Sequence, residues 1–141
     1  MSNPKGALMK RLISLLLCLI FIIATFGCAP ENGQTAAIAT VIITAADGTS
    51  LANESCGLPV GRTTAKEAVE TVCQALNITY QNKNGLYDGF AGISSTQEDG
   101  WLIYFNGKLS DKGLKDIQLD SEGENLIEIK YVNYEEAFKG N

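Results

Sequence analysis

The amino-acid sequence predicts an α+β domain, and three features of the 141-residue chain carry this prediction. Ile38–Thr44 is a run of β-branched and apolar residues, an apolar stripe of helical period begins at Ala65, and short strand-like segments separated by turns follow Ile78. This order of elements lets a mixed sheet of short strands pack on one amphipathic helix. The expected architecture is therefore β-grasp-like.

The first part of the domain is expected to be a hairpin followed by a loop. Ile38–Thr44 suits a strand that is buried on both faces, and Asp47-Gly48 is the usual dipeptide of a hairpin turn. The turn would lead into a weak second strand at Thr49–Glu54. Asn53–Gly61 is rich in small and turn-forming residues and is predicted to be a loop.

The helix has a clear start and a clear apolar face. Thr64 and Glu67 form a Thr-x-x-Glu capping box, which satisfies the free amide donors of the first turn. Asn77 is expected to end the helix. The apolar residues at helical spacing, which predict one buried stripe, are Ala65, Ala68, Val69, Val72, Cys73 and Leu76.

The rest of the domain alternates between short strands and turns. Trp101–Phe105 is a strongly aromatic strand, and Asn106-Gly107 turns the chain back. Asn125–Val132 alternates between apolar and charged residues, as a half-buried strand does. Tyr134–Asn141 is expected to be a polar tail. Shorter strands are expected at Ile78–Tyr80, Leu86–Ile93, Lys108-Leu109 and Ile117–Leu119.

The N-terminus has the layout of a secretory signal peptide. Lys5, Lys10 and Arg11 precede an apolar run at Leu12–Phe26, and small residues follow it. This run is shorter than the roughly twenty residues that a helix needs to cross a bilayer. The part of the chain after the signal peptide is therefore expected outside the cytoplasm.

Gly27-Cys28 resembles the lipobox of bacterial lipoproteins, in which the cysteine is acylated. Thr25 and Phe26 depart from that motif, so an uncleaved membrane anchor and ordinary cleavage near Ala29 stay open as alternatives. A lipid-anchored chain would lie on the outer face of the cytoplasmic membrane. The expected organisation is a signal peptide at 1–27, a lipid-anchored tether at 28–36, one domain at 37–133 and a tail at 134–141.

Composition narrows the class of function. Three of the 11 basic residues lie in the signal peptide, so the exported part keeps 8 basic against 16 acidic residues and is not expected to bind nucleic acid. The chain contains no histidine, the commonest general base and metal ligand, and no motif favours catalysis by other groups. We therefore expect a binding or interaction module without cofactor or metal, and not an enzyme.

Cys56 and Cys73 are the only cysteines after Cys28. In an oxidising compartment such a pair predicts a disulfide that joins the Asn53–Gly61 loop to the helix. It would close a loop of about seventeen residues and contribute roughly 3 kcal/mol to stability. The alternative is that both are small apolar side chains, since Cys73 lies on the buried stripe of the helix.

Gly100–Gly107 (GWLIYFNG) resembles the signature of transcobalamin C-terminal-like domains, which are common in secreted and lipid-anchored proteins of Gram-positive bacteria. The similarity extends over Ala39–Val132, although the family usually has Gly-Asp where this chain has Gly123-Glu124. In animal cobalamin carriers the related domain closes over one face of the corrinoid. The resemblance thus implies the fold, and it implies cobalamin or another corrinoid as the ligand of an extracytoplasmic binding module.

The residues that would contact such a ligand are aromatic side chains and a turn amide. On the aromatic strand Trp101 shares one face with Ile103 and Phe105, and Tyr104 shares the other with Leu102. We expect ligand contacts from Trp101, Tyr104, Asn106 and Tyr87; the alternative is that these rings only pack the domain. The expected partners are a membrane transporter or a surface protein. A surface adhesion or protein-interaction domain without a small-molecule pocket is the other functional hypothesis.

Overall fold

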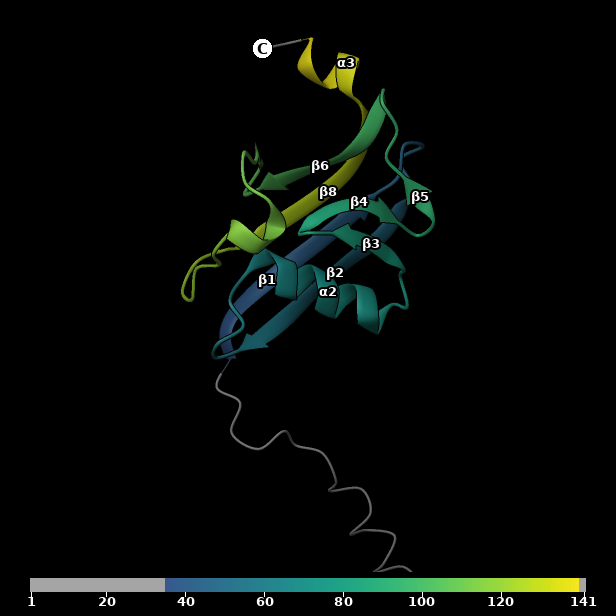
Figure 1. Cartoon of the computed structure of the whole chain (residues 1–141). Coiled ribbons are helices and arrows are strands. Elements are labelled where there is room, and N and C mark those ends of the chain that lie inside the picture. The colour runs from purple at the N-terminus through teal and green to yellow at the C-terminus, as the bar shows by residue number, and fades with distance from the viewer. Residues whose placement is uncertain (1–34, 140–141) are drawn as a thin grey trace, which may run out of the picture. The chain divides into compact units, whose positions relative to one another are not determined.

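The computed structural model describes residues 35–139 (Figure 1). The predicted signal peptide and Cys28 lie outside these residues. The strands are β1 (Thr35–Thr44), β2 (Ser50–Pro59), β3 (Tyr80–Lys83), β4 (Leu86–Phe90), β5 (Ile93–Ser94), β6 (Asp99–Phe105), β7 (Lys108–Leu109) and β8 (Leu126–Asn133). The helices are α2 (Ala65–Ala75), α3 (Tyr134–Phe138) and a 3₁₀ turn, η1 (Leu114–Asp116).

The main sheet has five strands in the order β2-β1-β8-β6-β7. β1 and β8 are parallel, with Val41 opposite Ile127 and Ile43 opposite Ile129, whereas the other neighbours are antiparallel. The first and last strands of the domain therefore lie at the centre of the main sheet, and β3-β4-β5 form a separate second sheet. The α+β prediction, with a mixed sheet on one main helix, is confirmed.

One face of the main sheet carries the core, and α2 lies over β1 and β2 on this face (Figure 1). The predicted cap is present, since the Glu67 amide donates to Thr64 Oγ1 at 3.4 Å and the Thr64 amide donates to Glu67 Oε2 at 3.0 Å. The helix ends at Ala75, and Asn77 follows in the left-handed region with φ 56°. The buried core residues all belong to residues 37–129.

Two predicted irregular segments are regular in the structure. β2 continues to Pro59 through most of the predicted loop at Asn53–Gly61, because Ala52 and Leu58 face the core while backbone pairing with β1 holds the polar residues between them. The predicted polar tail begins with α3, whose first turn is capped by Asn133 Oδ1 accepting from the Glu136 amide at 3.2 Å. Neither helix formed by residues 35–139 is long and apolar enough to span a bilayer.

The predicted disulfide is not formed, and both cysteines are free. The Cys56 thiol lies over the middle of α2 and donates to the Ala68 carbonyl at 3.7 Å. Cys73 is five residues further along the helix, which corresponds to a rise of about 7.5 Å, and it is buried in the core. The two thiols therefore lie at different positions along the axis of α2. Both cysteines are small apolar side chains, as the alternative to the disulfide predicted.

Candidate functional site

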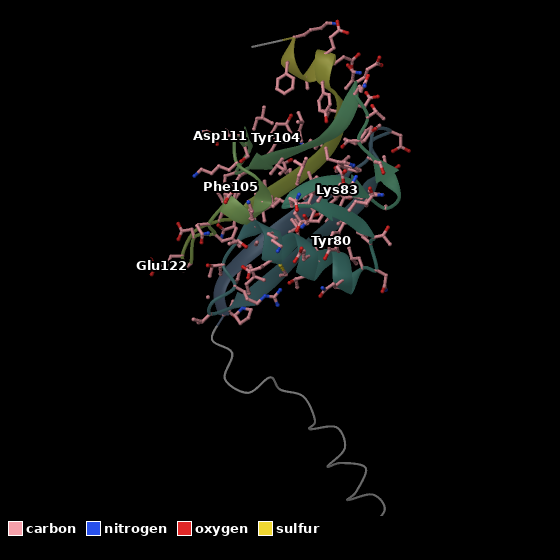
Figure 2. All side chains as sticks on the ribbon, in the orientation of Figure 1. Tyr80, Lys83, Tyr104, Phe105, Asp111 and Glu122 are labelled. Carbon is pink, nitrogen blue, oxygen red and sulfur yellow. The ribbon has the colours of Figure 1, made fainter. Side chains whose placement is uncertain are left out.

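The two faces of β6 have different environments. Trp101, Ile103 and Phe105 face the core, in accordance with the period of a strand. Tyr104, which Figure 2 labels on β6, has the opposite parity and points to the other side of the sheet, away from the face on which α2 contacts β1 and β2. We call this side the open face. The sequence predicted that these residues alternate between the two faces of β6, and the structure shows that the Trp101 face is the buried one.

Trp101 is a core residue, with 7% of its surface exposed. Its indole Nε1 donates to the Ile93 carbonyl at 3.0 Å, which ties β6 to the second sheet. Its ring meets Phe90 edge-on at 5.1 Å and Tyr131 edge-on at 5.0 Å between centroids. Trp101 is therefore unavailable as a stacking surface for a ligand.

Tyr87 is also buried and continues the same row of rings. It stacks on Phe90 at 6.0 Å and lies 5.7 Å from Tyr80, so the aromatic row runs from β3 to β8 through the core. The Tyr87 hydroxyl donates to Glu70 Oε1 at 2.6 Å. Burial, followed by this bond to a carboxylate, raises the pKa of Tyr87 above its ordinary value of 10.0. Tyr87 thus joins the second sheet to α2.

Asn106 has a structural role in the β6–β7 turn. Its φ of 50° places it in the left-handed region, which asparagine tolerates better than most residues. Its amide donates to the Leu126 carbonyl at 2.9 Å, and its Oδ1 accepts from the Leu126 amide at 2.8 Å. Both bonds hold this turn against the start of β8.

Tyr104 is the predicted ligand residue that the structure places on the open face. The Lys130 ammonium lies 4.9 Å from the centroid of its ring, and the same ammonium pairs with Glu128 Oε1 at 2.9 Å. Glu128 and Leu109 stand opposite Tyr104 on the neighbouring strands. A half-buried aromatic ring with a cation and a carboxylate beside it is a suitable contact for an amphipathic ligand.

A cleft of about 490 Å³ lies beside this ring, and we call it the Tyr104 cleft. Its walls come from the β1–β2 turn, β6, β8 and α3, and they include Ala46, Asp99, Tyr104, Val132, Glu136 and Ala137. Asp99 and Glu136 are its charged lining residues, and Asp99 Oδ1 accepts from Asn133 Nδ2 at 2.9 Å. The cleft combines an aromatic wall with carboxylate and amide groups, and its volume is in the range of small-molecule sites.

The contribution of α3 to this cleft was missed because residues 134–141 were predicted to be a tail. A usable signal is present, since Asn133 and Glu136 have the Asn-x-x-Glu spacing of a helix start, as Thr64 and Glu67 do. Within residues 35–139 no three Cys, Asp or Glu side chains are grouped so that they would hold a metal ion.

The buried thiol of Cys73 predicts a loss of stability in alkali. Burial, followed by the charge of Glu70, raises the pKa of Cys73 from 9.0 to about 11. Because the thiol ionises at a lower pH in the unfolded chain than in the folded one, the free energy of unfolding is unaffected below pH 9 and falls as the pH rises toward 11. The expected loss is about 2 kcal/mol. Urea unfolding at pH 7, 9 and 10.5 measures this loss. Cys73→Ala should reduce it, and equal stability of the wild type at pH 9 and 10.5 would contradict the assignment.

The fold and the cleft define a small α+β domain with an open-sided cleft. No family model matches the sequence, and no curated protein matches it. Haptocorrin in complex with Cbi has a similar structure, with 10% sequence identity, a TM-score of 0.54 and coverage of 75% of this chain and 28% of haptocorrin. A protein of Ruminococcus gnavus ATCC 29149, proposed to bind metal, has 11% identity, a TM-score of 0.48 and coverage of 69% of this chain and 97% of its own.

The similarity to haptocorrin establishes a shared fold at low sequence identity. This chain spans only about a quarter of the length of haptocorrin, since the match covers 28% of that protein. The match agrees with the transcobalamin-like resemblance of Gly100–Gly107 at the level of the fold.

Proposed function

We propose that the chain is a membrane-anchored extracytoplasmic binding module whose ligand is a corrinoid, and that it is not an enzyme. The observation that carries the proposal is the haptocorrin-like fold combined with an accessible cleft that the Tyr104 ring lines. A corrinoid presents an apolar ring bordered by amide groups. Tyr104 supplies an aromatic surface for the ring, and Asp99, Asn133 and Lys130 supply partners for amides.

The size of the cleft limits how the ligand is held. A cleft of about 490 Å³ that opens to solvent can cover one face or one edge of a corrinoid and leaves the remainder exposed. We infer that a partner covers the other face. A membrane transporter that receives the ligand is the partner that fits an anchored module, because few residues separate Cys28 from the start of β1 at Thr35 and an anchor there would keep the domain near the bilayer.

The anchor is tested separately from the ligand. We expect growth with labelled palmitate to label the full chain through Cys28, and Cys28→Ser to remove both the label and the membrane association. Cys56→Ser is the control and should keep both, because Cys56 lies within the folded domain, in β2. Membrane association of an unlabelled Cys28→Ser variant would favour the uncleaved anchor instead.

The ligand is tested by titrating the chain Ala29–Asn141, which contains the whole core, with cobinamide and cobalamin and recording the visible absorbance. We expect saturable binding with a Kd below about 1 mM, which corresponds to at least about 4 kcal/mol. Tyr104→Ala should weaken binding about three- to tenfold through loss of the ring contact, whereas Tyr104→Phe should bind as the wild type does.

Leu86→Ala provides the matched control, because Leu86 is 70% exposed and lies on the second sheet, outside the cleft. Its affinity should equal that of the wild type. No absorbance change with either corrinoid at millimolar concentration would refute the ligand assignment, and equal losses in Tyr104→Ala and Leu86→Ala would refute the site.

A second function is favoured by the apolar character of the open face. Ile38 is 61% exposed and Leu109 is 42% exposed on this face, one at each side of the sheet. Exposed apolar side chains of this kind can contribute to the contact surface for another protein. A surface interaction module without a small-molecule ligand would use the same face, and it would leave the corrinoid titration without effect.

A further inference from the structure

β2 is an edge strand of the main sheet with ten residues, which is long for an edge (Figure 1). β1 is its one partner in this sheet, and in residues 35–139 no other strand pairs with it. An edge of this length presents a row of backbone donors and acceptors that can pair with another chain.

The hydrogen bonds of β1 identify which residues of β2 present that row. The Thr40 amide donates to the Asn125 carbonyl at 2.8 Å, so even-numbered residues of β1 direct their backbone groups toward β8. Odd-numbered residues of β1 therefore direct theirs toward β2, where Ala39 stands opposite Cys56 and Val41 opposite Glu54.

It follows that even-numbered residues of β2 use their backbone groups on β1 and odd-numbered residues direct theirs outward. Outside the strand ladders, none of the backbone hydrogen bonds in the described part of the chain involves these outward residues. The outward residues are Leu51, Asn53, Ser55 and Gly57.

The usual protections against edge pairing are weak on this strand. Natural edges carry charged side chains, prolines or bulges along their length. In β2 the one charged residue is Glu54, Pro59 stands at the very end, and the irregularities of the β1–β2 register lie at its two ends. The segment from Leu51 to Gly57 is regular, and three of its outward residues are exposed.

We propose that this edge is a dimerisation surface on which β2 of a second copy pairs in antiparallel fashion. Pairing centred on Ser55 places Ser55 opposite its own copy and Asn53 opposite Gly57 of the other copy, which gives about six backbone hydrogen bonds across the interface. Pairing centred on Glu54 would place two like charges opposite each other and is disfavoured. The Ser55-centred register therefore keeps the two Glu54 carboxylates off each other and pairs uncharged outward residues across the interface.

Anchoring strengthens this association, and this step alone rests on the lipid anchor proposed above. Confinement to one membrane surface raises the local concentration of the chains above that in solution. A weak dimer would therefore form more readily on the membrane. The solution experiments below use neither the anchor nor a corrinoid, so their outcome is independent of the proposed function.

Sedimentation equilibrium of the chain Ala29–Asn141 from about 10 μM to about 1 mM tests the pairing. We expect a reversible dimer with a Kd below about 1 mM. Asn53→Pro removes an outward amide that β1 does not use, so this variant should remain monomeric with an unchanged far-ultraviolet circular dichroism spectrum. Asn53→Ala is the matched control: it keeps the amide and should dimerise as the wild type does. A monomeric wild type at all concentrations, or a dimeric Asn53→Pro variant, would overturn the proposal.

Cross-linking tests the register without a proline. In the Ser55-centred register, position 54 of one copy lies opposite Cys56 of the partner subunit in a non-hydrogen-bonded pair, with Cα atoms about 4.5 Å apart. Mild oxidation of Glu54→Cys should therefore give a covalent dimer in which position 54 is joined to position 56, and the wild type should stay uncross-linked. Bonds between two positions 54, or a Glu54→Cys chain that remains monomeric, would overturn this register.

Discussion

Trp101→Ala is expected to lower the free energy of unfolding by about 3–5 kcal/mol, the range for removal of a buried tryptophan. The change removes a ring that contacts Phe90 and Tyr131 at about 5 Å, and it leaves the Ile93 carbonyl without its indole donor. Because Trp101 joins the two sheets, its loss should loosen the second sheet first. Urea unfolding monitored by circular dichroism measures the effect.

Tyr104→Ala is the matched control for this prediction, because the residue lies on the same strand with its side chain on the open face. Its expected cost is below about 1 kcal/mol, as for a surface contact. Equal destabilisation by the two substitutions would show that β6 buries both faces. That result would also remove Tyr104 from the candidate site.

Asn125→Asp is expected to destabilise the domain by about 3 kcal/mol or more, although the side chain keeps its shape. Asn125 is 4% exposed, and its Nδ2 donates to the carbonyls of Ile38 at 2.9 Å and Asp120 at 2.8 Å. The aspartate would place a second acceptor against these two carbonyl oxygens. Only the bond from the Asp120 amide to Oδ1, at 2.8 Å, would survive.

Asn82→Asp tests whether the cost comes from the lost donor. Asn82 is exposed, and its Oδ1 accepts from the Gly85 amide at 2.8 Å, a bond that a carboxylate can also accept. Its stability should change by less than about 0.5 kcal/mol. Thermal unfolding at pH 7 compares both variants, and equal losses would contradict the role assigned to Asn125.

Local signals in the sequence were sufficient for the helix. Thr64 and Glu67 lie within one turn of each other and Asn77 directly follows the apolar stripe, so the cap and the end of α2 could each be predicted from neighbouring residues. The length of β2 was underestimated because its middle segment, Asn53–Gly57, has few apolar residues. Its regularity comes from pairing with β1 along its whole length, which the sequence of β2 does not show.

The candidate site was only partly predictable for a related reason. Both faces of β6 are apolar, and the packing of Phe90 from a distant strand decides that Trp101 is buried and Tyr104 is not. Asn125 gave no signal, because its bond to the Ile38 carbonyl joins residues 87 positions apart and only its bonds to Asp120 are local in the sequence. The cysteine pair was wrongly predicted to be bonded because sequence spacing does not show that Cys56 lies against Ala68, more than one helical turn from Cys73.

The most direct test of the proposed function is an amide nuclear magnetic resonance titration of the chain Ala29–Asn141 with cobinamide. The proposal predicts saturable shifts concentrated at the Tyr104 cleft, at Asp99, Tyr104, Val132 and Ala137, and an unshifted indole N–H of Trp101, which is bonded inside the core. Absence of shifts at millimolar cobinamide, or shifts centred on the second sheet around Tyr87, would contradict it.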